Sequence, residues 1–383
     1  MDLTKYDVYR PARYNVWMRL IFLQHWPSIV DDLNKFRIIY AGAGDHSFYH
    51  RPIDTIIEEV KDFYNSGVRV FFFENLSEGV MISDLDKLNE ICGSAMHLPD
   101  IKFFYICGDY NAEISVNKHF SDKKIYFRTI GVSHFEWAGH NFLPYEKPYV
   151  TGPKQKKFLC FNRVPRQHRI DLLNNIVERG LLDQSFYSFD TIDEEALKII
   201  RNVKPLNGID QIRHRFPLVL NRNIERDNPT NIIEDDFNYF EDSYFSVIPE
   251  TMFYDPVHDL PNGAGYHILN TYPGNFLSEK TYKSIRMKHP FIIVGPHRSL
   301  EFLKSRGYKT FSYFIDESYD LVEDSFLRMK MITDEIERLC NLSEQELIDF
   351  TEFAKNIVEH NYNVLASVNN FNTLNDLGSI LNI

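Results

Sequence analysis

Short runs rich in β-branched and aromatic residues alternate with stretches of helical spacing along this chain, and the alternation occurs twice. Such alternation predicts parallel sheets whose strands are joined by right-handed helical crossovers. Residues 139–157, with three prolines and no clear periodicity, separate the two series. The order predicts an α/β protein of two Rossmann-like domains facing a cleft, one at residues 1–150 and one at 151–383.

The first domain is predicted to contain four strands, at 37–41, 68–73, 101–107 and 124–130. Apolar residues at helical spacing predict helices at 52–65 and 84–92. Asp84 and Asp86 have the letters of a metal-binding Asp-x-Asp pair. However, Ser83 precedes them and apolar spacing follows, which favours the capped start of a helix. No metal site is therefore predicted there.

The second domain is predicted to be the larger, and two long helices close it. Strands are expected at 157–161, 185–189, 216–220, 244–249, 290–295 and 308–311. Helices are expected at 165–179, 193–203, 278–288, 298–306, 323–340 and 343–367. A length of 383 residues agrees with two domains, since a single hydrophobic core seldom grows that large.

Cysteine usage and hydropathy bear on the compartment. The four cysteines are scattered and lack metal-ligand spacing, so we interpret them as reduced thiols: Cys92, Cys107, Cys160 and Cys340. No run approaches 18 apolar residues, and the first eleven residues lack the apolar centre of a secretory signal. We therefore expect a cytoplasmic protein that does not bind a membrane.

Charge is unevenly distributed. The net charge of −12 weighs against a general nucleic-acid binder, because nonspecific affinity comes from cations that neutralise phosphates. Yet residues 280–309 hold eight Lys or Arg against one acidic residue, whereas residues 227–279 hold ten acidic residues and no Lys or Arg. A local anion site is therefore expected on an acidic protein.

One candidate anion site begins at Asn162, where an expected strand turns into a helix. Arg163, Arg166 and Arg169 crowd the first turns of that helix, although cations are unfavourable at the positive end of the helix dipole. A bound anion would reverse this penalty, since helix N-termini bind phosphates readily. The alternative is that the arginines point outward and pair with acidic side chains.

A second candidate site combines a strand end with the next helix start. Glu250 ends an apolar strand, at the edge where open α/β sheets bind ligands. Ser278 suits a helix N-cap and Glu279 the first turn, whereas Lys280 does not suit the dipole and favours an anionic partner. A capped helix without a ligand explains Ser278 and Glu279 equally well. Gly295, after the next strand, allows either close backbone approach or a simple turn.

A resemblance is carried by the strand with Glu250-Thr251, by Ser278-Glu279-Lys280-Thr281-Tyr282-Lys283 and by the strand ending in Gly295. Together they resemble the donor-binding region of GT-B glycosyltransferases of the α-1,3-fucosyltransferase and exostosin type. The element Asn162–Arg169 is similar to one in phage and giant-virus glycosyltransferase-like proteins. The resemblance covers about residues 157–340. Thr251 and Ser278 stand where the fucosyltransferases have Asn and Thr.

The resemblance implies a role for several of these residues. Glu279 would hold the ribose of a nucleotide-diphosphate sugar and Lys280 its diphosphate. Glu250 would face the donor or its sugar, and Arg163 or Arg166 would cover charge on the leaving diphosphate. Asn162, Arg169, Ser278 and Gly295 complete the expected donor site.

The general base is expected from the first domain, in a loop after a strand. The candidates are Asp45, in a Gly-rich stretch after the first strand, and Glu136. The Gly-x-Gly beside Asp45 lacks the third glycine of a dinucleotide fingerprint. Asp45 also has an ordinary interpretation as a turn or cap residue.

The expected activity is an inverting transfer of a sugar from a nucleotide-diphosphate donor to a hydroxyl, with no cofactor and no obligatory metal. The acceptor would be a glycan or small molecule. One alternative is a phage-type DNA glycosyltransferase acting on hydroxymethylated cytosine, located in the host cytoplasm if the protein is viral. Another is a noncatalytic nucleotide- or glycan-binding protein on the same scaffold.

Overall fold

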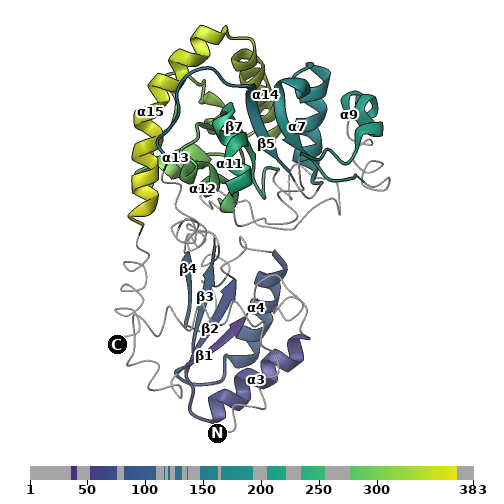
Figure 1. Cartoon of the computed structure of the whole chain (residues 1–383). Helices are drawn as coiled ribbons and strands as arrows, with labels where there is room; N and C mark the ends of the chain where they lie inside the picture. The colour runs from purple at the N-terminus through teal and green to yellow at the C-terminus, as the bar shows by residue number, and fades with distance from the viewer. Residues whose placement is uncertain are drawn as a thin grey trace. The chain divides into compact units, whose positions relative to one another are not determined.

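The computed structural model describes residues 36–40, 52–75, 82–108, 116, 120, 126–131, 136, 147–162, 165–192, 205–220, 234–254 and 277–368 (Figure 1). The chain divides into two compact units. Among the described residues, those up to 131 belong to unit 1, and those from Glu136 to 254 and from 277 to 368 belong to unit 2.

Unit 1 contains a parallel sheet of four strands in the order β1-β2-β3-β4. Its strands are β1 (Phe36–Tyr40), β2 (Val70–Asn75), β3 (Lys102–Cys107) and β4 (Tyr126–Gly131). Helix α3 (Ile53–Asn65) connects β1 to β2, and α4 (Ile82–Ala95) connects β2 to β3. Each strand therefore lies beside the one that follows it in the chain, as short helical crossovers favour.

The core of unit 1 lies between its helices and its sheet. Ile56 and Val60 of α3 are fully or almost fully buried, and they belong to one apolar cluster with Phe71 and Phe103 of the sheet. The rings of Phe71 and Phe103 lie 5.7 Å apart. Phe72, which points to the opposite face, is also buried. Burial of both faces explains why these strands are continuous apolar runs.

Unit 2 contains a second parallel sheet, in the order β6-β5-β7-β8. Its strands are β5 (Lys156–Phe161), β6 (Ser185–Ser188), β7 (Ser243–Pro249) and β8 (Phe291–Val294). The helices are α7 (Gln167–Glu178), α9 (Asn207–Ile212), α11 (Glu234–Glu241), α12 (Glu279–Arg286), α13 (Ser299–Ser305), α14 (Ser325–Cys340) and α15 (Glu344–Ala366). Three short 3₁₀ helices are Leu182–Gln184, Arg213–Arg215 and Ser318–Leu321.

The strand order of unit 2 reverses between β5 and β7. The chain runs from β5 outward to β6 on one side, and from β7 outward to β8 on the other. Right-handed crossovers in opposite directions place α7 and α12 on opposite faces of the sheet. Accordingly, α7 packs with α9 and α14, whereas α12 packs with α15 (Figure 1). This reversal is a topological switch point, the place where open α/β sheets bind ligands.

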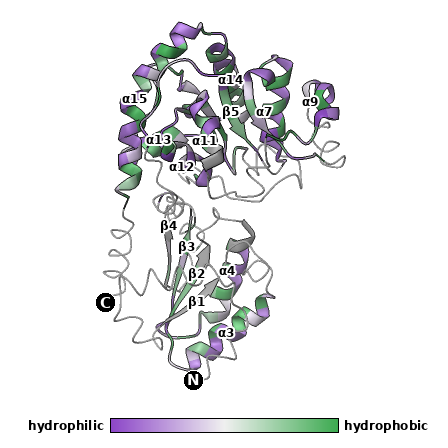
Figure 2. Cartoon of the chain, viewed as in Figure 1, coloured by the Kyte–Doolittle hydropathy of each residue, from purple (hydrophilic) through white to green (hydrophobic). Residues whose placement is uncertain are grey.

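Capping residues and glycines mark where helices of unit 2 begin and end. The hydroxyl of Ser343 caps α15 and Glu346 completes a capping box. Gly180 follows α7 with a φ of 68°, a conformation that glycine adopts without strain. Figure 2 shows hydrophobic and hydrophilic stretches together along α3 and α15, as expected for helices with one face in a core.

The predicted α/β class is confirmed, with one parallel sheet in each unit. Most predicted strands and helices of the described residues are also confirmed. The four cysteines are buried and free, in α4, β3, β5 and α14. The helix expected at 193–203 lies outside the described residues.

Two predicted strands are wrong. Residues 216–220 form only an isolated antiparallel bridge between Leu218 and Phe189. At 308–311, backbone N–H groups donate to side chains instead of to a neighbouring strand. The Phe311 N–H donates to Glu317, and the Lys309 N–H donates to Asn361. The short helices α9 and α11 were not predicted.

Candidate functional site

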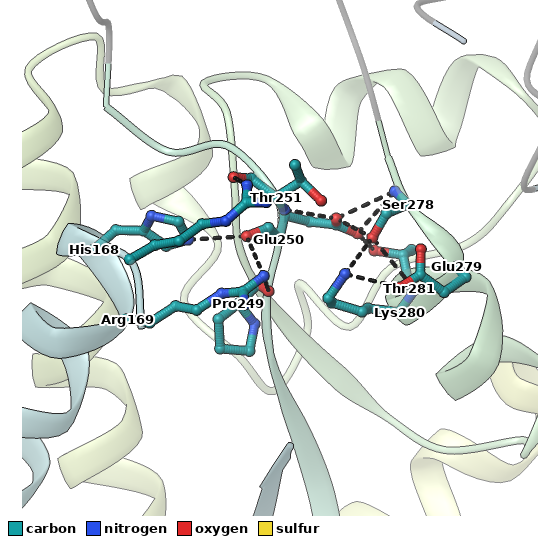
Figure 3. A network of polar contacts seen from close by, with 10 residues as sticks. His168, Arg169, Pro249, Glu250, Thr251, Ser278, Glu279, Lys280 and Thr281 are labelled. Atoms are coloured by element: carbon teal, nitrogen blue, oxygen red, sulfur yellow. Dashed lines mark hydrogen bonds and ion pairs between the residues drawn. The ribbon is translucent and has the colours of Figure 1, made fainter. Parts of the chain in front are cut away.

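Most of the predicted site residues that the structure describes lie at the carboxyl edge of the unit 2 sheet. The starts of α7 and α12 both contact the residues where β7 ends (Figure 3). Because β5 and β7 flank the switch point, side chains from the two opposite faces meet there. The described residues of the sequence elements at 162–169 and 278–283 therefore meet at one edge of the sheet.

Glu250, directly after β7, has a fully buried carboxylate. Its oxygens accept hydrogen bonds from the hydroxyls of Ser278 and Thr281, both at 2.6 Å. They also accept from the backbone N–H groups of Ser278 at 3.1 Å and of Thr251 at 3.1 Å. Four donors satisfy this carboxylate within the protein, which is what a buried charge requires.

Side chains from the start of α7 hold the backbone where β7 ends. His168 Nε2 lies 2.8 Å from the carbonyl oxygen of Glu250, and Arg169 Nη2 donates to the same oxygen at 3.3 Å. Arg166 Nη1 donates to the carbonyl oxygen of Thr251. These contacts fix the strand exit against α7, so the β7 end is held from both sides (Figure 3).

Burial and the positive charges near the starts of α7 and α12 lower the pKa of His168. Burial lowers the pKa of His168 well below its ordinary value, and the charges of Arg169, Arg166 and Lys280 lower it further. Neutral His168 must donate from Nε2, because a carbonyl oxygen only accepts. Cations from both helix starts therefore act on one point of the carboxyl edge.

Lys280 and Glu279 form an ion pair in the first turn of α12. Lys280 Nζ lies 2.9 Å from Glu279 Oε1, and the two side chains are only 15% and 12% exposed. Lys280 Nζ also donates to Ser278 Oγ at 3.1 Å. Burial alone would raise the pKa of Glu279, but Lys280 and Lys283 lower it overall, so the carboxylate is ionised at neutral pH.

A small pocket lies beside this pair. Lys280, Lys283 and Ser284 of α12 line it from one side, and Phe161 and Phe240 belong to its apolar lining. Lys283 is 3% exposed. The lining thus includes two lysines and two phenylalanines, together with β7 residues up to Pro249 at the carboxyl edge.

The two helix starts differ in their charge balance. The start of α12 has Glu279 in its first turn and the carboxylate of Glu250 on its N-cap residue. The first turn of α7 has no acidic residue, and its N-cap is Arg166, which makes no side-chain cap. The positive dipole end of α7 is therefore the less compensated of the two, which favours an anion there.

Two amides lie near the start of α7. Asn162 is 1% exposed and donates to Cys160 Sγ at 3.2 Å, but its Oδ1 has no hydrogen-bond partner among the residues that the structure describes. Both polar atoms of the Gln167 amide are also buried, with no partner in the described part of the chain. Burying such a group unpaired costs about 1–3 kcal/mol, so both amides are suited to complete their bonds with a ligand.

Gly295 lies close to the Cβ atom of Glu250. A Cβ at position 295 would come within 2.9 Å of Ile293 Cγ2 and 3.5 Å of Glu250 Cβ. Only glycine fits this approach without a shift of its neighbours. Gly295 therefore packs against the carboxyl edge rather than forming a simple exposed turn.

Glu136 lies in unit 2, where it contacts Arg306 and Tyr308 rather than the residues around Glu250. It is fully buried, and its Oε2 accepts from Arg306 Nη2 at 2.9 Å and Nε at 3.1 Å, while its Oε1 accepts from the Tyr308 hydroxyl at 2.9 Å. A carboxylate paired in this way is held for structure and is poorly placed to take a proton from an acceptor. Asp45 and Arg163, also predicted as catalytic, lie outside the described residues.

Among the described residues, no three His, Cys, Asp or Glu side chains gather as a metal-binding group. Within the same residues, no helix is long and apolar enough to cross a membrane.

No protein-family model matches the chain, and no curated protein matches it. A solved structure of a DNA-modifying β-glucosyltransferase, studied with and without uridine diphosphoglucose, is similar to it with a TM-score of 0.29. The identity is 12%, over 85% of this chain and 99% of that one. A likeness at this level indicates neither a shared fold nor a shared activity.

Sequence reasoning missed three members of the site: His168, Gln167 and Thr281. All three lie inside the motifs that the sequence singled out. The signal for Thr281 was its position three residues after an N-cap serine, which places its hydroxyl near the same helix end. Nothing in the local sequence indicated that His168 contacts the β7 exit, because 82 residues separate it from Glu250.

Proposed function

We propose that this protein is a glycosyltransferase of the GT-B architecture, which moves a sugar from a nucleotide-diphosphate donor to a hydroxyl acceptor. The observation that carries the proposal is a set of contacts at the switch point of unit 2. Arg166 and Arg169 donate to the backbone directly after β7, and Lys280 donates to Ser278, whose hydroxyl binds Glu250. The carboxylate of Glu279 lies beside Lys280. Cations bind a diphosphate, and a carboxylate accepts from the two hydroxyls of a ribose. This combination fits a nucleoside diphosphate.

The proposal assigns a separate role in binding or catalysis to each charged side chain of the site. Lys280 and Arg166 bind the diphosphate and stabilise the charge that develops on it as the glycosidic bond breaks. Glu279, released from Lys280, accepts from the ribose. Asp45 of unit 1 takes the proton of the acceptor hydroxyl, and the transfer inverts the anomeric centre. Glu136 is the weaker candidate for the base, because Arg306 and Tyr308 already occupy its carboxylate.

The acceptor is proposed to be a glycan or small molecule. The basic block at 280–309 has few cations left for a phosphate backbone. Besides Lys280, four of its members form ion pairs among the described residues of unit 2: Lys288 with Glu359, Arg298 with Glu301, Lys304 with Glu317, and Arg306 with Glu136. Lys283 and Arg286 are buried. Hydroxymethylated cytosine in DNA is the alternative acceptor.

The test is a turnover assay with radiolabelled sugars on UDP, GDP and dTDP. Release of nucleoside diphosphate without an acceptor supports a transferase, since such enzymes hydrolyse their donors slowly. Binding without any release, with every donor and acceptor tried, would instead support a noncatalytic nucleotide-binding protein. Label that enters a glycan or small alcohol supports the proposed acceptor, and label that enters hydroxymethylcytosine DNA supports the alternative.

A further inference from the structure

We infer that Glu250 is a positioning residue that acts on Lys280 through the hydroxyl of Ser278, and that it does not touch the donor. The inference deepens the proposed function, and it rests on that function only for the task given to Lys280. It differs from the role that the resemblance implied, in which Glu250 faces the donor or its sugar.

The carboxylate of Glu250 has little capacity left to bind a donor sugar. Both oxygens of Glu250 are occupied: Oε1 by the Thr281 hydroxyl and Oε2 by the Ser278 hydroxyl, with the backbone N–H groups of Ser278 and Thr251 adding to them. The residue is 0% exposed. A donor sugar would have to displace one of these bonds to reach it.

The hydroxyl of Ser278 links Glu250 to Lys280. The Ser278 hydroxyl has a single proton, which it donates to Glu250 Oε2 in the 2.6 Å hydrogen bond. The lone pairs of Oγ are then free to accept, and Lys280 Nζ donates to them at 3.1 Å. Glu250 therefore sets the direction of the Ser278 hydroxyl, and the hydroxyl in turn holds the ammonium group of Lys280 (Figure 3).

Glu250 contacts the starts of both α7 and α12. The carbonyl oxygen of Glu250 accepts from His168 and Arg169 of α7, while its carboxylate binds Ser278 and Thr281 at α12. One residue thus joins the helices that lie on opposite faces of the sheet. A diphosphate that bridges Arg166 and Lys280 requires a fixed distance between these helices, and Glu250 provides it.

The experiment uses the full chain with Glu250→Gln and measures two quantities. A glutamine offers one acceptor oxygen, and its NH₂ group competes with Lys280 for the Ser278 lone pairs. We expect an amine-reactive ester, read by mass spectrometry, to label Lys280 several-fold faster than in the unaltered protein. We also expect the affinity for inorganic pyrophosphate to fall about tenfold.

Matched variants separate positioning from general damage. Glu317 is a similar carboxylate, 6% exposed, which accepts from the Phe311 N–H and the Thr310 hydroxyl. Glu317→Gln should lower the melting temperature without changing either readout. Ser278→Ala should reproduce both effects of Glu250→Gln, and the double variant should add little, because the two residues act in one chain. Ser278→Thr keeps the hydroxyl and should restore both readouts.

The outcomes are separable from those of the proposed function. If Glu250→Gln and Ser278→Ala label Lys280 no faster than Glu317→Gln does, the positioning role is overturned. The same holds if Glu250→Gln does not fold but Ser278→Ala leaves the labelling unchanged. If labelling rises as expected while the unaltered protein binds no pyrophosphate, Glu250 positions Lys280 and the proposed donor site is wrong.

Discussion

The ammonium group of Lys280 lies 2.9 Å from the carboxylate of Glu279, its neighbour in the chain, in the first turn of α12. A lysine there opposes the helix dipole, and Glu279 offsets that penalty in the protein without a ligand. A nucleoside diphosphate offers a partner to each member of the pair, since phosphate binds the ammonium and ribose hydroxyls bind the carboxylate. The pair is therefore suited to open when a nucleotide binds.

The variant Lys280→Ala tests whether Lys280 binds the phosphates of a nucleotide. A charge-assisted hydrogen bond contributes about 1.5–3 kcal/mol, so the affinity for UDP, GDP or dTDP should fall roughly 10–150-fold. Isothermal titration calorimetry measures the change. The control is Lys330→Ala, which removes a 67% exposed lysine from a surface pair with Asp334 and should leave the affinity unchanged. An unaltered affinity in Lys280→Ala would remove this residue from the donor site.

The two candidate bases should behave differently. Asp45→Asn should lower turnover by roughly 10²–10⁴-fold, the usual contribution of acid–base catalysis, with little change in donor affinity. Glu136→Gln should instead lower the free energy of unfolding by about 1.5–3 kcal/mol, because it weakens buried bonds from Arg306 and Tyr308. Steady-state kinetics and urea denaturation of both variants decide between them. Loss of turnover in Glu136→Gln at unchanged stability, with an active Asp45→Asn, would reverse the assignment.

Asp320 should make stability depend on pH. It is 6% exposed, and burial raises its pKa to about 6 although it caps α13 through the N–H groups of Leu300 and Glu301. A carboxyl whose folded pKa lies above its ordinary value stabilises the fold at low pH, and this contribution is lost as pH rises through about 6.

The measurement compares the wild-type protein with Asp320→Asn, whose side chain does not titrate. Between pH 7 and pH 4 the free energy of unfolding of the wild type should rise relative to the variant, by at most about 3 kcal/mol. Denaturation curves at each pH provide the difference, which cancels the titration of other groups. A difference that stays constant over this range would show that Asp320 titrates normally.

Much of the fold follows from local sequence. The strands of both sheets were predicted within about two residues, because parallel strands buried on both faces are unbroken apolar runs such as Phe71–Phe73 and Phe291–Val294. The start of α12 was predicted from Ser278, since an N-cap depends on the residues beside it. The short helix α11 was missed because eight residues give little periodicity.

The contacts of the site were less accessible to prediction. Glu250 was recognised as a strand-end carboxylate, but its partners lie 28 and 31 residues later. Glu136 resembled a catalytic residue in a loop, whereas Arg306, 170 residues later, pairs with it. Such pairings follow from the packing of the sheet and its helices, and no local pattern reports them.

Activity is expected to survive excess EDTA. The positive charge that stabilises a leaving diphosphate comes from Arg166 and Lys280 in this account, which is the task that a metal ion performs in other transferases. The assay is donor turnover with and without the chelator. Complete loss of turnover that manganese or magnesium restores would contradict the account of these two residues.

The most direct test of the central claim is a crystal structure with a bound nucleoside diphosphate, from a panel of UDP, GDP, dTDP and CMP as the monophosphate control. The account predicts the diphosphate at the carboxyl edge of the unit 2 sheet, within hydrogen-bond distance of both Lys280 and Arg166, and the ribose hydroxyls on Glu279. The carboxylate of Glu250 should keep its bonds to Ser278 and Thr281. A nucleotide bound elsewhere, or phosphates that contact neither Lys280 nor Arg166, would contradict the proposed donor site.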